Sequence, residues 1–410
     1  MLKNKLAGNI ISLFTLKGAE YIISFITLPY LLRVLGPEKY GAIAFVQVII
    51  NYGVLLVDYG FNLTAPRDIA RVEASDRPRH FSAIMGAKIA ILTIILLIGI
   101  VIFSTIQTTL DIYLLVCMLP MLIGNVMFPI WYFQGIQQMK FITVFNIMAR
   151  IVSVSGIFIL VQSRDDYLWA AFLQSFTPLL AGIIAMLVLL KQNPSLLCLP
   201  SLVDIKEKLY DGWDIFISTL FINLYTNSNI FILGLMTNDI VVGYYAAASK
   251  LVDAVKGLFS PISNAIFPHI SVLFKESKER AVSFLCSVLR IIGGLSFIIS
   301  LLVFVFAEQI AGIVMGQGYE ESIFILQIIS FLPFIIGLSN IFGIQTMVAM
   351  GMKRVFSRIL MLSALLNFIL VFPFVYMWQG IGLAMTVVIV ECFVTITMYI
   401  ALRKNNIVLL

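Results

Sequence analysis

Two stretches of the sequence, 213 residues apart, decide how the chain is organised. Residues 119–140 read LPMLIGNVMFPIWYFQGIQQMK and residues 332–353 read LPFIIGLSNIFGIQTMVAMGMK. They align without gaps and share six of 22 positions, including the opening Leu-Pro, Gly124 with Gly337, and the closing Met-Lys. Apolar segments match by chance more easily than polar ones, so the shared Pro, Gly and Lys carry most of the signal. The alignment predicts that one half of the chain repeats the other.

A second, fainter correspondence places Tyr40-Gly41 opposite Val242-Gly243. Together the two correspondences predict two halves, residues 1–200 and residues 201–410. If each half holds an even number of membrane spans, the halves have the same orientation and are related by an axis along the membrane normal. Two such bundles enclose a cavity between them, which is the architecture of alternating access.

The composition excludes a soluble protein. The chain has 410 residues, of which 61% are hydrophobic and 12% charged, whereas soluble domains have about 45–50% apolar and about 25% charged residues. The mean hydropathy is +1.04. The net charge of +6 therefore has to be interpreted by its position in membrane loops and not as a sign of nucleic-acid binding. We expect an all-α polytopic membrane protein.

Hydrophobic windows predict twelve transmembrane helices. A helix needs about 20 apolar residues to cross the hydrocarbon, and such windows lie near residues 9–32, 41–62, 84–106, 113–133, 142–162, 168–190, 214–236, 241–266, 283–306, 322–347, 359–377 and 381–402. With the N-terminus inside, the inner segments hold 19 of the 27 Lys and Arg residues and the outer loops hold 3. This asymmetry follows the positive-inside rule and predicts that both termini are cytoplasmic.

Polar side chains form stripes on the first two predicted helices of each half. Charges at the centre of a bilayer cost about 2.5–3.5 kcal/mol on insertion scales, so those that persist usually face a cavity or a partner. Because successive residues of a helix turn by about 100°, the stripe members share one face. They are Lys17 and Glu20 on the first helix, Asn51 and Asp58 on the second, Asn229 on the seventh, and Lys250, Asp253 and Lys256 on the eighth.

These stripes have two interpretations. They line a hydrophilic cavity between the halves, or Lys17 with Glu20 and a lysine with Asp253 are local pairs that neutralise each other in a packed bundle. Glu391, alone on the last predicted helix, is either a proton site or a helix-packing hydrogen bond.

The chain lacks the signatures of the common enzyme classes. There is no P-loop, neither histidine has a metal-ligand neighbour, and the four cysteines lack the spacing of a zinc site or a disulfide framework. The predicted loops are too short for a soluble domain, which disfavours a membrane enzyme or scaffold. We therefore expect no enzyme activity, cofactor or metal. We expect a transporter driven by an ion gradient, by the membrane potential or by the gradient of its cargo.

Four motifs resemble a known family. LPYLLRVLGPEKYGAIAFVQ (28–47), DYGFNLTAPRDIAR (58–71), WYFQGIQQMK (131–140) and VGYYAAASKL (242–251) are similar to the Wzx-type polysaccharide flippases of the multidrug/oligosaccharidyl-lipid/polysaccharide exporter superfamily. The resemblance extends along the whole chain. It implies that the chain moves an undecaprenyl-pyrophosphate-linked oligosaccharide, such as an O-antigen repeat unit, between the leaflets of a bacterial inner membrane. Other polysaccharide assembly proteins are expected partners.

The resemblance gives each polar stripe an expected role. Lys17, Lys250 and Lys256 would bind the pyrophosphate or an acidic sugar, and Asn51 and Asn229 would bind sugar hydroxyls. Glu20, Asp58 and Asp253 would couple transport to H⁺ or Na⁺. Arg67 and Arg71 would form an inner gate or meet the incoming pyrophosphate, or they serve only as a positive-inside anchor. The isoprenoid tail can stay in the surrounding lipid.

A drug or organic-cation exporter of the same superfamily is the alternative. Such an exporter would favour an acidic, aromatic cavity. The three lysines Lys17, Lys250 and Lys256 stand against the three acids Glu20, Asp58 and Asp253, so the charges of the stripes do not decide between the two cargoes.

Overall fold

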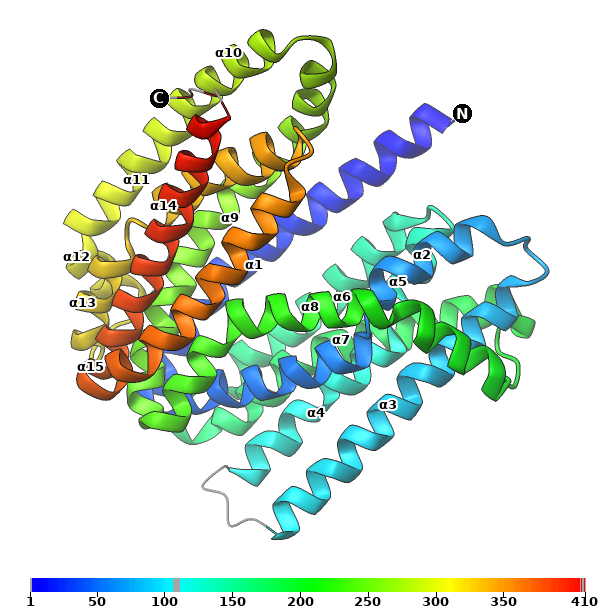
Figure 1. The fold of residues 1–410 in the computed structure, drawn as a ribbon. Coiled ribbons are helices and arrows are strands. Elements are labelled where there is room, and N and C mark those ends of the chain that lie inside the picture. The colour runs from blue at the N-terminus through cyan, green and yellow to red at the C-terminus, as the bar shows by residue number, and fades with distance from the viewer. Residues whose placement is uncertain (1, 106–110, 406, 408, 410) are drawn as a thin grey trace. The chain divides into compact units, whose positions relative to one another are not determined.

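The computed structural model describes the backbone of residues 2–105, 111–405, 407 and 409. It also describes the side chains of these residues, except for those of residues 2–17, 19–22, 103, 221–222, 224–227, 260–261, 264–265 and 268. The described residues form helices and no strands (Figure 1). The helices are α1 (Leu2–Asp58), α2 (Phe61–Arg71), α3 (Arg77–Thr105), α4 (Ile112–Met127), α5 (Ile130–Gly135), α6 (Met139–Leu160), η1 (Arg164–Asp166), α7 (Tyr167–Gln192), η2 (Pro194–Leu196), α8 (Leu202–Met236), α9 (Asp239–Glu276), α10 (Lys278–Val288), η3 (Leu289–Gly293), α11 (Gly294–Val305), α12 (Ala307–Val314), α13 (Glu320–Ile329), α14 (Leu332–Asn340), η4 (Ile341–Val348) and α15 (Lys353–Lys404).

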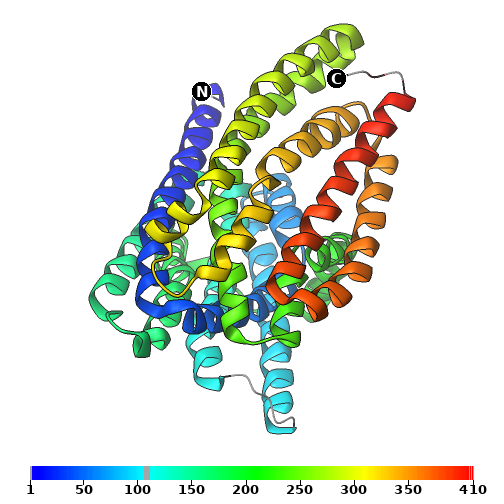
Figure 2. The ribbon, with the colours of Figure 1, turned by 90° about the vertical axis from the view of Figure 1, so that its left-hand side faces the viewer.

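The two longest helices are each broken at one residue. α1 has 57 residues and α15 has 52, so an unbroken rod of either would be about 80 Å long, far more than the ~30 Å of hydrocarbon. Gly36 in α1 (φ 70°) and Gln379 in α15 (φ 48°) leave the helical region. The two parts of α15 lie side by side and antiparallel, coloured orange and red in Figures 1 and 2.

The helices confirm a multi-pass membrane protein. Among the described residues, eight helices are long and apolar enough to cross a membrane, and two of the eight contain the breaks at Gly36 and Gln379. The prediction of twelve spans in two bundles around a cavity remains a prediction.

Two segments predicted as cytoplasmic loops contain helix. The second predicted span was drawn to residue 62, but the helix ends at Asp58, where Tyr59 and Gly60 adopt positive φ and α2 begins. The predicted loop 191–213 likewise contains the start of α8. A search for apolar windows misses such helices because only one of their faces is buried. In α2 that face consists of Phe61, Thr64, Ala65 and Ile69.

The two repeated stretches break their helices at equivalent positions. α4 ends at Met127 and α14 ends at Asn340, and these positions are 213 residues apart, as in the sequence alignment. After Met127 the chain leaves the helix at Phe128 and Pro129 before α5, whereas after Asn340 it continues as the π-helix η4. The repeat therefore preserves the place of the break, although the two halves make it by different means.

The chain divides into two compact units. Unit 1 consists of Met1–Thr27 and Ile43–Ser228, and unit 2 of Leu28–Ala42 and Asn229–Leu410. Compared with the predicted halves, residues 28–42 pack with the second unit and residues 201–228 with the first. The division of the transport bundles at residue 200 remains a prediction.

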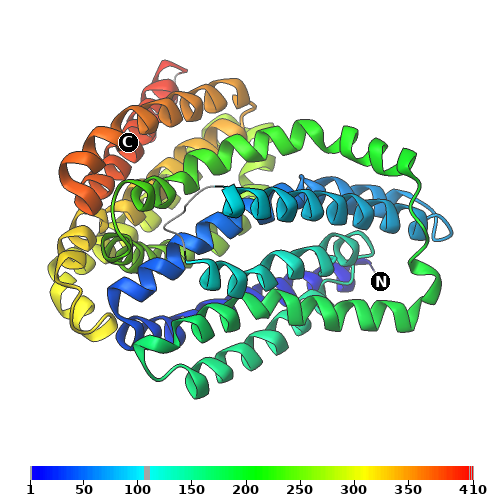
Figure 3. The same ribbon diagram turned by 90° about the horizontal axis from the view of Figure 1, so that it is seen from below.

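In unit 1, α7 packs against both α4 and α6 (Figure 3). The repeat residue Gly124 makes the close crossing of α4 and α7 possible, since a Cβ at this position would overlap the backbone of Pro178 and Leu179. Gly182 approaches Met127 and Phe128 in the same way. In unit 2, α9 packs against α10, α13, α14, α15 and η4 and forms the centre of that unit.

Residues 28–42 are bound to unit 2 through backbone contacts. Arg33 donates a hydrogen bond to the carbonyl oxygen of Ile313, and the hydroxyl of Tyr319 donates to the carbonyl oxygen of Leu32 at 3.2 Å. Gly41 and Gly243, which the second sequence correspondence pairs, lie directly against each other. A Cβ on Gly41 would overlap the carbonyl oxygen of Asp239, and one on Gly243 that of Pro37.

We predict that Gly41→Ala lowers the thermal stability of the purified protein. Its methyl group would meet backbone, which cannot move aside as a flexible side chain can, and overpacking of this kind typically costs about 1–3 kcal/mol. Gly312→Ala is the matched control, because a Cβ at this helical position meets nothing within 4 Å. Thermal unfolding in detergent measures both; equal midpoints for the two variants would contradict the close glycine contact.

Candidate functional site

Lys256 in α9 lies among carboxylates of unit 2. Its Nζ is 2.6 Å from Oδ1 of Asp253, and the two side chains are 30% and 49% exposed. Glu391 of α15 lies within electrostatic range of Lys256, a proximity that the sequence did not indicate. The local pair expected under the packed-bundle interpretation therefore exists, but both of its members remain accessible.

Two further predicted binding residues also lie in unit 2. Lys250 is exposed, and the described residues show no ion pair for it. The side-chain oxygen of Asn229 accepts a hydrogen bond from the amide of Asn367 at 3.0 Å, and Asn367 is buried. The structure thus brings Asn229, Lys250, Asp253 and Lys256 into one unit without placing them in one cluster.

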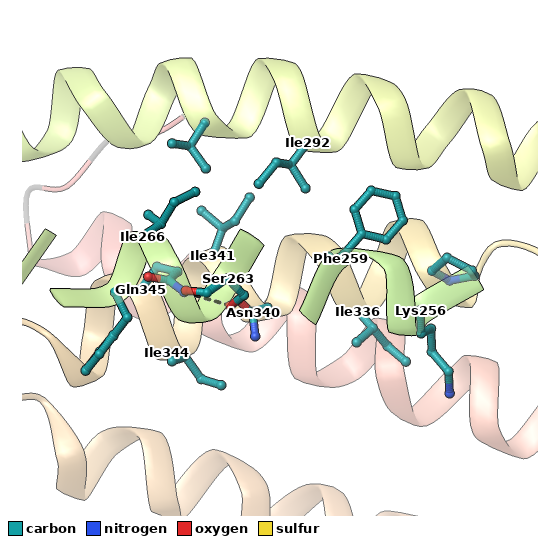
Figure 4. Close-up of a pocket in the computed structure, with 14 residues that line it drawn as sticks. Lys256, Phe259, Ser263, Ile266, Ile292, Ile336, Asn340, Ile341, Ile344 and Gln345 are labelled. Carbon is teal, nitrogen blue, oxygen red and sulfur yellow. Dashed lines mark hydrogen bonds between the residues drawn. The ribbon is translucent and has the colours of Figure 1, made fainter. Parts of the chain in front are cut away.

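A cavity of about 360 Å³ adjoins Lys256 (Figure 4). Its walls come from α9, from α10 with η3, and from α14 with η4. The lining residues are Lys256, Phe259, Ser263, Ile266, Phe267, Val288, Ile292, Pro333, Ile336, Gly337, Asn340, Ile341, Ile344 and Gln345. Lys256 provides the only charge among these described lining residues.

Three polar residues of the cavity wall bind one another. The amide of Gln345 donates to the hydroxyl of Ser263 at 2.8 Å and to its backbone carbonyl at 2.9 Å, and that hydroxyl donates to Oδ1 of Asn340 at 2.6 Å. This chain of hydrogen bonds joins α9 to α14 and η4. Oε1 of Gln345 is buried and has no hydrogen-bond partner among the described residues.

Both π-helical segments of the described chain border this cavity. η3 contributes Ile292, and η4 contributes Ile341, Ile344 and Gln345. A π-helical turn holds one more residue than an α-helical turn and is frequent at functional sites. The cavity therefore lies where two helices depart from regular geometry.

In unit 1, the predicted coupling residue Asp58 forms an ion pair with Lys88 of α3. The distance from Lys88 Nζ to Asp58 Oδ1 is 3.3 Å, and the side chain of Lys88 is 2% exposed and that of Asp58 17%. Sequence reasoning missed Lys88 and assigned it to the cytoplasmic loop. No local spacing could reveal the pair, because its members lie 30 residues apart on different helices.

The predicted gate residues lie at α2. Arg67 binds the neighbouring Asp68 at 3.1 Å, and Asp68 also binds Lys208 of α8 at 2.8 Å. Arg71 is exposed at the end of α2. Near them, Arg79 binds both carboxylate oxygens of Asp204 at 2.6 and 2.8 Å and holds the pKa of Asp204 below its usual range. These pairs join α2 and α3 to the first turns of α8.

The remaining predicted site residues give less information. Asn51 is exposed on the second part of α1. The side chains of Lys17 and Glu20 lie outside the described residues. Beyond them on the first part of α1, Thr27 donates a hydrogen bond to the carbonyl oxygen of Ile23 at 2.7 Å, and Ser24 accepts one from Arg150 at 3.0 Å.

Comparisons with known proteins place the chain in a family. Residues 6–274 match the model of the family described as polysaccharide biosynthesis protein. The chain is 35% identical over 412 aligned residues to an Escherichia coli (strain K12) protein named "Putative O-antigen transporter", with 98% of each chain covered. A Shigella dysenteriae protein of the same name is 30% identical, with 96% of this chain and 99% of that one covered. The chain belongs to the polysaccharide biosynthesis protein family.

Solved structures show the same fold for this family member. The lipid II flippase MurJ in an inward closed conformation matches with a TM-score of 0.74 at 11% identity, over 96% of this chain and 87% of that one. An inward-facing multidrug resistance MATE family transporter of the MOP superfamily matches with a TM-score of 0.67 at 13% identity, over 93% and 94%. The fold is therefore one found in transporters and lipid flippases.

We predict that Lys88 and Asp58 depend on each other for stability. Removing one member of a buried pair leaves an uncompensated charge and costs about 3–5 kcal/mol, whereas replacing both by apolar groups is often neutral. Lys88→Met and Asp58→Leu should each lower the thermal midpoint, and the double variant should recover most of the loss. The three midpoints are measured on detergent-solubilised protein. Additive losses in the double variant would show that the pair does not stabilise unit 1.

Proposed function

We propose that this chain is a flippase that moves undecaprenyl-pyrophosphate-linked oligosaccharide repeat units from the cytoplasmic to the periplasmic leaflet of a bacterial inner membrane. The similarity to two O-antigen transporters over nearly the whole chain carries the proposal. The likeness of the fold to a lipid flippase supports the same reaction type.

The pyrophosphate of the cargo would bind at Lys256. A pyrophosphate needs cationic partners, and Lys256 is an accessible cation beside a membrane-embedded cavity. In the absence of cargo, Asp253 neutralises this lysine at 2.6 Å. A bound phosphate oxygen would replace the carboxylate, so Lys256 would have an anionic partner both with and without cargo. Lys250, one turn and a half away on α9, and Lys17 would add positive charge, and Asn51 and Asn229 would meet the sugar.

Release of Asp253 from Lys256 provides a route for ion coupling. A carboxylate that loses its lysine to the cargo is free to bind H⁺ or Na⁺, so we assign coupling to Asp253 together with Glu20. Asp58 is the weaker candidate, because Lys88 already neutralises it in unit 1. Arg67, fixed by Asp68, and the exposed Arg71 would meet the incoming anionic head at the inner surface.

Alternating access would use twelve spans with both termini in the cytoplasm. The breaks at Gly36 and Gln379 turn two of the eight apolar helices into four spans, and α8 and α9 supply two more. In this topology the contacts of Arg33 with Ile313 and of Gly41 with Gly243 lie at the outer surface. They would close the outer side while cargo enters from the inside, and they would separate when the outer side opens.

We predict that Lys256→Gln abolishes restoration of surface polysaccharide. The test uses a strain whose own gene is deleted and whose long-chain polysaccharide is visible on a gel. Wild type should restore the long chains, and Lys256→Gln should leave lipid-linked repeat units on the inner leaflet. Lys275→Gln, at the exposed end of the same helix, is the matched control and should restore the long chains.

Blots of membrane fractions must show equal amounts of the three proteins. Full restoration by Lys256→Gln would remove this lysine from the site. Normal polysaccharide in the deletion strain itself would favour the drug-exporter alternative.

A further inference from the structure

The cavity of unit 2 is elongated along α9. Along α9 it extends from Lys256 to Phe267, eleven residues, or about 16 Å at a rise of 1.5 Å per residue. Figure 4 shows Lys256 at one end of the row of lining side chains and Ile344 and Gln345 at the other. The cavity is thus long, and the single cation among its described lining residues lies at one end.

Apart from Lys256, the described lining residues offer little to a polar ligand. Ten of the fourteen lining residues carry no polar side-chain atom. Of the other three, Ser263 and the amide group of Gln345 bond to each other, and the side-chain oxygen of Asn340 accepts from Ser263. The side-chain oxygen of Gln345 is buried, so the amide nitrogen of Asn340 is the one further polar group that these described residues offer to a ligand. A ligand of this cavity would therefore be apolar along its length and anionic at one end.

We propose that this cavity takes the isoprene units next to the phosphate of a polyprenyl-phosphate carrier, with the phosphate at Lys256. The inference rests on the proposed function, and it differs from the sequence-based expectation that the whole tail stays in lipid. With carbon–carbon bonds of about 1.5 Å, an extended isoprene unit spans about 5 Å. About three units therefore match the length of the cavity.

The geometry favours a polyprenyl chain over a membrane phospholipid. A phospholipid carries two chains on one head, whereas the described lining residues place a single cation at one end of one elongated cavity, which fits a single chain. The π-helical segments η3 and η4 both border this cavity. A carrier held here would have its phosphate nearer the bilayer centre and its first isoprene units towards the inner end of α9.

This orientation matches the one that the lipid has after transport. In the outer leaflet the head points outwards and the tail extends back towards the bilayer centre. A phosphate at Lys256 with the chain running towards Phe267 already has that direction in the proposed topology. A carrier bound in this way would therefore already be inverted relative to its orientation in the inner leaflet, while its sugar remains in water.

Binding of undecaprenyl phosphate to the purified full chain tests the inference. The probe is titrated against wild type in detergent, and binding is followed by the shift in thermal unfolding and by native mass spectrometry. Ile292→Trp and Ile336→Trp fill the cavity from opposite walls, and each should weaken binding about tenfold, equivalent to ~1.4 kcal/mol. Ile298→Trp, on the same continuous helix as Ile292 but facing outwards, should bind like wild type.

The variants separate this inference from the proposed function. If both cavity-filling variants bind undecaprenyl phosphate like wild type while Lys256→Gln does not, the tail lies outside the cavity and only the head site remains. Equal binding of phosphatidylglycerol, with the same loss in Ile292→Trp, would assign the cavity to a bilayer phospholipid and overturn the inference. If wild type binds no undecaprenyl phosphate, the inference is wrong, and the restoration of surface polysaccharide tests the proposed flippase separately. If one tryptophan variant fails to fold, binding of undecaprenyl phosphate to the other variant tests the inference from the opposite wall.

Discussion

The need to neutralise charge within a membrane-embedded chain is the constraint on which the structure depends. Lys88 and Asp58 meet this need in unit 1 with a pair that is almost wholly buried. Lys256 and Asp253 meet it in unit 2 with a pair that remains accessible. The difference in burial separates two roles for charges that look alike in sequence. The buried pair holds α3 against the end of α1, and the accessible pair can exchange one partner for an anionic ligand.

Breaks in helices set the shape of the second polar site. The repeated stretches lose regular helix at Met127 and at Asn340, where one half uses a proline and the other a π-helix. The π-helix contributes a wall of the cavity beside Lys256. Equivalent positions of the two stretches are thus followed by a turn at Phe128 and Pro129 in unit 1 and by a π-helix that borders the cavity in unit 2.

The sequence predicted the fold class, the long apolar helices and the repeat because each depends on local composition or spacing. Lys256 with Asp253 was foreseeable for the same reason, since the pair lies within one turn of helix. The partner of Asp58 was not foreseeable, because Lys88 lies on another helix, and neither was the proximity of Glu391 to Lys256. The search for apolar windows missed α2 and the start of α8 because one face of each helix is exposed and charged, although the other face is buried. The roles of Lys250, Asn51 and Asn229 remain predictions, as do those of Lys17 and Glu20.

Transport of the intact cargo across a reconstituted membrane tests the central claim most directly. Purified protein is inserted into liposomes that carry undecaprenyl-pyrophosphate-linked oligosaccharide on one leaflet, and a glycosidase added on the other side reports each sugar that crosses. We predict that the protein makes the oligosaccharide accessible much faster than in protein-free liposomes. An unchanged rate, in liposomes where the same protein moves an organic cation, would contradict the account.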